Sequence, residues 1–284
     1  MTTVTDNPQG ALARDTLPPP DARPAHSSQR TRNSTRPRDT RPGNTHAAPG
    51  ASSVQGTATI PVSGLLDVTD GKAFIRSEGY QRGPSDTSLS LTQVRQYGLR
   101  RGDLVTGAAR PAQPGNPGKS GNPRERHATL TQVDLVSGLD PKQAAQRPHF
   151  TELTPLHPQQ RLRLETPAGS PTARIIDLIT PIGKGQRGLI VAPPKAGKTM
   201  VLQAIAAAVA ANHPEVHLMV VLIGERPEEV TELRRTVHGE VVSATFDQAA
   251  EEHIAVAELA IERAKRLVEL GRDVVVLLDS MSLL

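Results

Sequence analysis

Apolar residues occur in short runs along two separate stretches of the chain, and turn-forming residues divide one run from the next. In the first stretch, the runs cover residues 64–68, 72–77, 103–109 and 128–136. Short apolar runs bounded by glycine and aspartate predict β-strands. About five short strands within roughly 75 residues favour a small closed barrel.

One short helix is predicted within this first stretch. Ser90 has the side chain of a helix N-cap and Gly98 can end a helix, so we expect a helix over residues 91–97. Among small closed barrels, the OB-fold (cold-shock-like) is the commonest kind that binds nucleic acids. The first stretch is therefore predicted to be an all-β OB-fold domain.

Barrels of this kind hold single-stranded nucleic acids on aromatic side chains. The candidates here are Phe74 and Arg76, with Tyr80 or Tyr97 as further ones. From the pattern alone, a residue such as Phe74 is more often part of a core than a stacking surface. The sequence leaves the role of Phe74 open.

The second stretch begins near Ile175, and its apolar runs alternate with helical patterns. The predicted strands cover residues 188–192, 216–224, 240–246 and 273–279, and the predicted helices cover 198–211, a segment starting at Pro227, and 248–270. Strands that are almost wholly apolar are typical of parallel sheets covered on both faces. Alternating strands and helices predict an α/β domain.

A phosphate-binding motif follows the first strand of this α/β domain. The segment APPKAGKT matches the template G-x-x-x-x-G-K-[ST], except that Ala192 stands in the place of the first glycine. Gly197 allows the backbone to curl, so that successive N–H groups and the start of a helix face a phosphate. Lys198 reaches the β- and γ-phosphates of ATP, and the hydroxyl of Thr199 ligates Mg²⁺.

Acidic residues stand at the ends of two predicted strands, where ligands of open α/β sheets bind. Asp279 is placed to hold the Mg²⁺ shell, and Glu225 is placed to polarise the attacking water. A glutamate at a helix start can also be a partner of the helix dipole, but Glu228 and Glu229 already supply that charge. The pattern therefore favours a catalytic role for Glu225.

Composition and charge narrow the class of protein. The 284 residues include 25 Pro, 23 Gly and no Cys, which excludes disulfides and a cysteine nucleophile. The formal charge of +4 permits a nucleic-acid partner without requiring one. No apolar run is long enough to span a membrane, and the start of the chain lacks the apolar core of a secretion signal, so we expect a cytoplasmic protein without a membrane partner.

Two segments have the composition of disordered chain. Residues 1–58 form an Arg/Pro-rich tail with few large apolar side chains, and residues 110–127 resemble a flexible insertion in the barrel. The tail is either a solvated extension or a weak, sequence-independent contact to RNA or DNA phosphates.

Longer motifs resemble the Rho family of bacterial transcription termination factors. They are PIGKGQRGLIVAPPKAGKTM, ERPEEVTE and VVVLLDS in the α/β stretch, and DGKAFIRS, VRQYGLRRGD and FTELTPLHPQQRLRLET upstream of it. Together these motifs run from about residue 60 to about residue 280. They are longer and more specific than a phosphate-binding loop alone.

The resemblance implies both an architecture and an activity. It implies an OB-fold RNA-binding domain at 59–137, a linker at 138–172 and a RecA-like ATPase domain at 173–284. It further implies an RNA-dependent ATPase and RNA–DNA helicase that uses ATP and Mg²⁺ and terminates transcription. The implied partners are nascent single-stranded RNA, the RNA polymerase elongation complex and five further copies in a homohexamer.

The resemblance also implies roles for individual residues. Glu225 is implied as the water-activating carboxylate, and Thr199 and Asp279 as the Mg²⁺ side of the site. Lys72, Phe74 and Arg76 are implied as RNA-binding residues. The implied ATP contacts are Gly183, Lys184, Gly185, Gln186, Arg187, Gly188, Lys195, Ala196, Gly197, Lys198, Thr199, Met200 and Arg226.

Three positions depart from the pattern of the family. Gly224 stands where an acidic residue is usual, and Lys72 and Ser88 stand where aromatic residues are common. If each stacked base contributes about 1–3 kcal/mol, two missing aromatic rings would weaken RNA binding considerably. RNA binding is still expected, with phosphate contacts from Lys72 and the tail replacing part of the stacking.

The family fold is expected to continue beyond Leu284. By this resemblance, the chain is the N-terminal two-thirds of a Rho protein, with an ATPase domain that is incomplete at its C-terminus. Two alternatives stay open: a non-catalytic fragment that binds RNA and nucleotide, and another hexameric RecA-like ATPase such as a rotary ATP synthase subunit.

Overall fold

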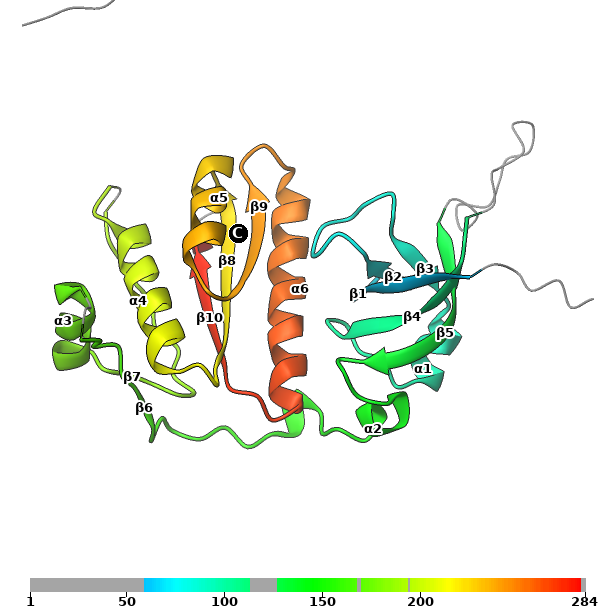
Figure 1. The fold of residues 1–284 in the computed structure, drawn as a ribbon, viewed down its shortest axis with the longest axis horizontal. Coiled ribbons are helices and arrows are strands. Elements are labelled where there is room, and N and C mark those ends of the chain that lie inside the picture. Colours follow the sequence, from blue (N-terminus) through cyan, green and yellow to red (C-terminus); the bar gives the residue numbers. More distant parts are fainter. Residues whose placement is uncertain (1–58, 113–126, 168–169, 194, 282–284) are drawn as a thin grey trace, which may run out of the picture. The chain divides into compact units, whose positions relative to one another are not determined.

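The computed structural model describes residues 59–112, 127–167, 170–193 and 195–281 (Figure 1). The expected tail at 1–58 and most of the expected insertion at 110–127 lie outside the described residues. The described residues carry a barrel, a connecting segment and a three-stranded sheet with helices. The barrel and the sheet belong to one compact unit.

The first domain is a closed barrel of five strands, as expected from its short apolar runs. The strand order is β1-β2-β3-β5-β4, in which β3 and β5 are parallel and the other pairs are antiparallel. The strands are β1 (Ile60–Thr69), β2 (Lys72–Arg76), β3 (Thr87–Leu89), β4 (Leu104–Arg110) and β5 (Ala128–Val136). The strand β3 was not predicted, because three residues are too short for a recognisable alternation.

The predicted helix of the barrel is confirmed as α1 (Leu91–Gln96). Ser90 Oγ accepts from Gln93 N at 3.2 Å, and Gln93 Oε1 accepts from Ser90 N at 3.0 Å. This reciprocal pair is a capping box, which satisfies two backbone donors at the start of the helix. Gly98, at φ +60°, turns the chain out of the helix.

A connecting segment follows the barrel and consists of short elements. These are α2 (Pro141–Ala145), the 3₁₀ helix η2 (Phe150–Glu152), β6 (Arg161–Leu162), α3 (Pro171–Ile179) and β7 (Ile182–Gly183). The strands β6 and β7 form a separate antiparallel pair. Asp177 of α3 accepts from Leu164 N and Glu165 N, which ties this helix to the segment that precedes it.

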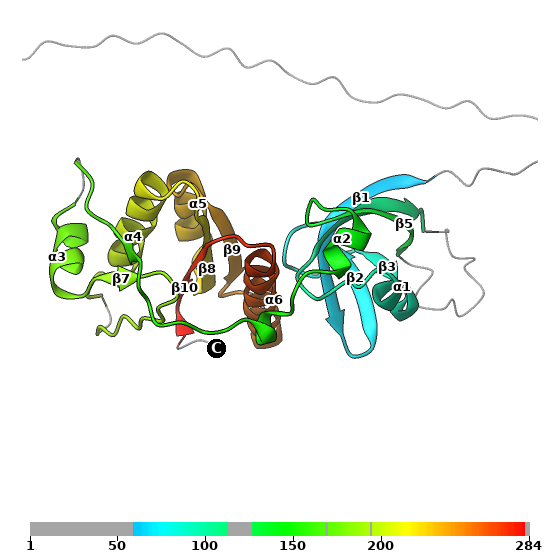
Figure 2. The ribbon, with the colours of Figure 1, turned by 90° about the horizontal axis from the view of Figure 1, so that it is seen from below.

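The second domain is a parallel sheet of order β10-β8-β9. Its strands are β8 (His217–Glu225), β9 (Glu240–Thr245) and β10 (Val274–Asp279), and its helices are α4 (Lys198–Asn212), α5 (Pro227–Thr236) and α6 (Ala250–Glu269). The views in Figures 1 and 2 show α4 and α5 on one face of this sheet and α6 on the other. These elements confirm the α/β domain with both faces covered.

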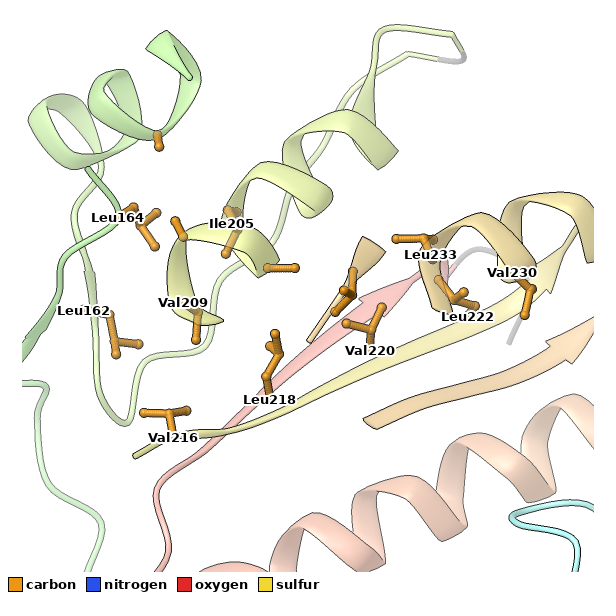
Figure 3. Packing of buried hydrophobic residues seen from close by; sticks show 14 residues of the cluster. Leu162, Leu164, Ile205, Val209, Val216, Leu218, Val220, Leu222, Val230 and Leu233 are labelled. Carbon is orange, nitrogen blue, oxygen red and sulfur yellow. The ribbon is translucent and has the colours of Figure 1, made fainter. Parts of the chain in front are cut away.

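The central strand β8 supplies side chains to two cores. Leu218, Val220 and Leu222 pack with α4 and α5 on one face (Figure 3). Met219, Val221 and Ile223 pack with α6 on the other face. All six side chains are at most 3% exposed. A strand that alternates between two cores in this way reads as one continuous apolar run.

The predicted strand at 188–192 is wrong for the described structure. These residues form no ladder with any described strand, and Leu189 and Val191 are 74% and 82% exposed. A strand requires a hydrogen-bonded neighbour, and the sheet ends at β10 among the described residues. The apolar composition of this segment is real, but composition alone does not provide a pairing partner.

A buried cluster of charges connects the barrel to α6. Glu269 Oε2 accepts from Arg100 Nη1 at 2.8 Å and from Arg147 Nε at 3.0 Å. Arg266 Nη2 lies 3.1 Å from Glu269 Oε1, and Asp103 Oδ2 accepts from Arg147 Nη2 at 2.6 Å. The side chains of Glu269 and Asp103 are fully buried. Removing one partner of such a cluster leaves buried charges without compensation.

We expect Glu269→Ala to lower the free energy of unfolding by about 3–5 kcal/mol, because three arginines lose their shared acid. Glu258→Ala is the matched control, since Glu258 also lies on α6 and pairs with a barrel residue, Arg101, but is 57% exposed. The control is expected to cost about 1 kcal/mol or less. Urea unfolding of both variants measures the difference, and equal costs would contradict the described burial of Glu269.

Candidate nucleotide and RNA sites

The helix α4 begins at a glycine, which has no side chain to cap the first N–H groups of the helix. Gly197 is the N-cap, with φ +86°, and supplies no capping side chain. The first N–H groups of a helix have no partner within the helix, and together with the helix dipole they form a site for an anion. Lys198 and Thr199 are the first two residues of α4 and are half-buried. This is the arrangement that the phosphate-binding motif predicts.

The end of β10 meets the start of α4. Thr199 Oγ1 donates to Asp279 Oδ2 at 3.1 Å, although 80 residues separate the two in the sequence. Asp279 is 5% exposed. A hydroxyl and a carboxylate side by side are oxygen donors of the kind that Mg²⁺ takes together with the phosphates of a nucleotide. Among the described residues, no group of three or more His, Cys, Asp or Glu side chains is placed to hold a metal ion by itself.

Glu225 lies at the end of β8, beside Asp279 and Lys198. Burial, together with the like charges of Asp279 and Glu229, raises the pKa of Glu225 to about 7, while the charge of Lys198 opposes this rise. A carboxyl group with a pKa near neutrality can accept a proton and release it at physiological pH. This property fits a group that polarises an attacking water.

Gly224, immediately before Glu225, makes the strand bulge. Its φ is +70°, and the pairing of β8 with β9 shifts register between Ile223 and Glu225. Glycine adopts this conformation without the steric cost that other residues incur. Gly224 therefore gives this strand end a left-handed backbone conformation and no side-chain charge.

The structure does not bring all of the expected ATP contacts together. In the segment 183–188, Lys184 Nζ pairs with Asp273 at 2.5 Å and with Glu215 at 3.6 Å. Asp273 directly precedes β10, whereas Asp279 ends it, and at about 3.3 Å per residue the two lie roughly 20 Å apart. Lys184 therefore lies toward the opposite end of the strand from Thr199.

The other expected ATP contacts lie near the start of α4 or on the surface. Lys195, at φ +64°, and Ala196 immediately precede Gly197. Arg226 is the N-cap of α5 and follows Glu225. The side chains of Arg187, Lys195, Met200 and Arg226 are exposed.

On the barrel, Phe74 faces away from the core. Its neighbours Ala73 and Ile75 are buried in the barrel core, while Phe74 is half-buried and pairs across the sheet with Asp67 and Ser88. Side chains alternate between the two faces of a strand. The structure thus answers the question that the pattern left open, because Phe74 is not part of the barrel core.

Lys72 and Arg76 share a face of β2 with Phe74, but only Lys72 is exposed. Arg76 is 5% exposed. Its guanidinium pairs with Asp67 and Asp86, and it lies 5.5 Å from the centre of the Phe74 ring. Arg76 is thus held by two carboxylates next to the ring of Phe74.

One aromatic neighbour of Phe74 was missed from the sequence. The ring of His127 lies 5.4 Å from that of Phe74 at an angle of 70°. Edge-to-face contacts of this kind are favourable. His127 immediately precedes β5, at the edge of the low-complexity segment, and that position was the only sequence signal. The pair comes together only because β5 pairs in parallel with β3.

The two tyrosines considered as further stacking candidates have other surroundings. Tyr80 donates a hydrogen bond to Glu240 of β9 and packs against the core on the α6 face of the sheet. Tyr97 packs against the barrel core.

No helix among the described residues is long and apolar enough to cross a membrane.

Two family models match the two domains. The model of the Rho termination factor RNA-binding domain matches residues 62–142. The model of the ATP synthase alpha/beta family nucleotide-binding domain matches residues 172–284. A solved ATP synthase subunit, NeqB from Nanoarcheaum equitans, aligns with a TM-score of 0.37 and 21% identity over 49% of this chain and 33% of its own, too weakly to carry an argument.

Curated relatives match across both domains. The transcription termination factor Rho of Streptomyces lividans is 62% identical over 223 residues, which are 78% of this chain and 31% of that protein. The Rho of Mycobacterium bovis is 57% identical over 222 residues, and that of Micrococcus luteus is 56% identical over 224 residues. Each match covers 78% of this chain, and the share of the relative is 36% and 32%. The chain belongs to the family of the transcription termination factor Rho.

Proposed function

We propose that this chain forms the RNA-binding and nucleotide-binding parts of an RNA-dependent ATPase and RNA–DNA helicase that terminates transcription. The observation that carries the proposal is the contact of Thr199 with Asp279 beside Glu225. The same chain bears a closed barrel with an outward-facing aromatic residue, Phe74. The names of the Rho relatives and the two family matches support this combination.

On the nucleotide side, the start of α4 provides the phosphate contacts. The N–H groups after Gly197 would bind phosphate oxygens, and Lys198 would place its charge beside the β- and γ-phosphates. Thr199 and Asp279 would hold Mg²⁺, which neutralises charge on the phosphates. The remaining ATP contacts implied by the resemblance, including residues 183–188, stay predictions.

Glu225 would act on the water that attacks the γ-phosphate. It can accept a proton only when it is ionised, so its activity should rise as the pH passes upward through about 7. The opposing charge of Lys198 favours the ionised form. Glu225 is thus the proposed catalytic residue.

On the RNA side, Phe74 and His127 would stack on bases while Lys72 contacts phosphate. Stacking on an aromatic ring tolerates any base, because every base has a π-face. Arg76 would hold Phe74 in place, since its guanidinium already bonds two carboxylates. The proposed ligand is therefore single-stranded RNA, without strong sequence preference.

The wider assembly is proposed from the family. We expect a homohexamer in the cytoplasm that acts on nascent RNA at the RNA polymerase elongation complex. The matched region covers about a third of the length of the relatives described above. A second candidate function is binding of RNA and nucleotide without hydrolysis.

The test is ATP hydrolysis by the 284-residue chain with and without single-stranded RNA. We expect hydrolysis that RNA stimulates, that rises with pH through about 7, and that is lost in Glu225→Gln. The change keeps the shape of the side chain but removes its ability to accept a proton. Glu228→Gln, in the first turn of α5, is the matched control. Bound RNA and nucleotide without turnover would favour the binding function instead.

For the RNA site, we expect Phe74→Ala to weaken binding of a short single-stranded RNA by about 1–3 kcal/mol for the lost stacking contact. Fluorescence anisotropy measures the affinity, and circular dichroism reports whether the barrel stays folded. Phe150→Ala is the control, since Phe150 lies outside the barrel and contacts Lys265. Unchanged affinity in Phe74→Ala would contradict the proposed RNA face.

A further inference from the structure

We propose that the loop of residues 77–86, here called the coupling loop, links RNA on the barrel to the nucleotide site, with Tyr80 as its positioning residue. The inference rests on the proposed function and deepens it, because it assigns a physical connection between the two sites. The connection consists of contacts between neighbouring residues, from the RNA face through the loop to strand β9 and from β9 to Glu225.

The base of the coupling loop is bonded to the RNA face. Arg76 pairs with Asp86 through one guanidinium nitrogen and lies under the ring of Phe74. His127 Nδ1 lies 3.2 Å from the backbone oxygen of Asp86. Asp86 is 2% exposed. An RNA base that displaces the side chain of Phe74 or His127 would therefore also disturb Arg76 and Asp86, which hold the end of the loop.

The loop is braced internally, so movement at its base can reach its tip. Gly83 N donates to Asp86 Oδ2 at 3.1 Å, and Asp86 N donates to Gly83 O at 3.3 Å. Ser85 Oγ donates to Glu78 Oε1 at 2.7 Å, and Ser77 Oγ donates to Ser85 O at 3.2 Å. These bonds cross the loop at two levels.

The tip of the loop is attached to β9 at two points. The hydroxyl of Tyr80 donates to Glu240 Oε1, while Glu240 Oε2 lies 2.7 Å from His217 Nε2. Gln81 Nε2 donates to the backbone oxygen of Ser243 at 3.0 Å. The strand β9 has β8 as its only partner among the described strands, so the loop contacts it from the unpaired side.

A groove of about 560 Å³ lies beside this attachment, between the loop tip and the helix α5. Tyr80 and Gln81 line it on the loop side, and Val230 and Arg234 line it on the helix side. In this proposal, the loop tip moves into the groove when RNA binds, and this would be the second arrangement that a coupling element needs.

The strand β9 pairs with the end of β8 that carries Glu225, the proposed catalytic residue. Ser243 is opposite Leu222 on β8, and Thr245 is opposite Glu225. Phe246 N donates to Glu225 O at 3.3 Å. The attachment of Gln81 to Ser243 is thus two residues from the pair that fixes the backbone of Glu225. The bulge at Gly224 lies immediately before Glu225.

The test measures whether RNA and nucleotide affect each other's binding to the complete chain. The affinity for a short single-stranded RNA is measured with and without ADP·Mg²⁺, and the affinity for ADP·Mg²⁺ with and without the RNA. Coupled sites must change each other's affinity by the same factor, commonly about 5- to 150-fold. We expect the wild-type chain to show this reciprocal factor.

Tyr80→Phe removes the hydroxyl that bonds Glu240 and keeps the ring that packs on the core. We expect the coupling factor to fall to near one, while each ligand alone binds within about twofold of wild type. Tyr97→Phe is the matched control, as the chain has only two tyrosines and Tyr97 is in the barrel. Gln81→Ala tests the second attachment and is expected to reduce the factor as well.

Each result decides between the two proposals. A wild-type factor that persists in both Tyr80→Phe and Gln81→Ala would overturn the role of the coupling loop and leave the proposed function standing. Binding of both ligands with no mutual effect in the wild type would do the same. If either RNA or ADP·Mg²⁺ fails to bind the wild-type chain, the proposed function fails, and the coupling proposal fails with it.

Discussion

The parallel pairing of β8 with β9 and β10 is the constraint on which the nucleotide site depends. Because the strands run in one direction, Glu225 and Asp279 emerge at the same edge of the sheet. The helix α4 packs on one face and brings Thr199 to Asp279. The alternation of β8 between two cores resists a slip of one residue, since such a slip would exchange the two sets of side chains.

A second feature of the structure is that arginines are buried in ion pairs. Arg76 and Arg147 each pair with two buried acids, one beneath the RNA face and one between the barrel and α6. Paired in this way, an arginine acts mainly as a structural support, because buried carboxylates compensate its charge. Arg76 is therefore not expected to contact RNA through its charge, and the proposed stacking residues are Phe74 and His127.

The sequence predicted the elements whose signals are local. The N-cap at Ser90 and the glycine before α4 are read within a few residues, and the structure has both helices where they were expected. The apolar runs of β8 and β10 likewise identify strands of a covered parallel sheet. Local signals also identified the strand ends at which Glu225 and Asp279 stand.

Features that depend on pairing between distant residues were not predictable. The apolar segment 188–192 lacks a described partner strand, and the contact of His127 with Phe74 depends on the pairing of β5 with β3. The burial of Arg76 depends on Asp67 and Asp86, which come from two other parts of the barrel. Each depends on which distant segments pair with one another, and local sequence signals do not reveal that pairing.

The most direct measurement of the central claim is the affinity for ATP with Mg²⁺ and with EDTA, in the wild type and in Asp279→Asn. If the end of β10 and the start of α4 form one site, Mg²⁺ strengthens ATP binding to the wild type. In Asp279→Asn this gain should largely disappear, while binding in EDTA is retained through Lys198 and the helix start. An unchanged gain in Asp279→Asn would contradict the site described here.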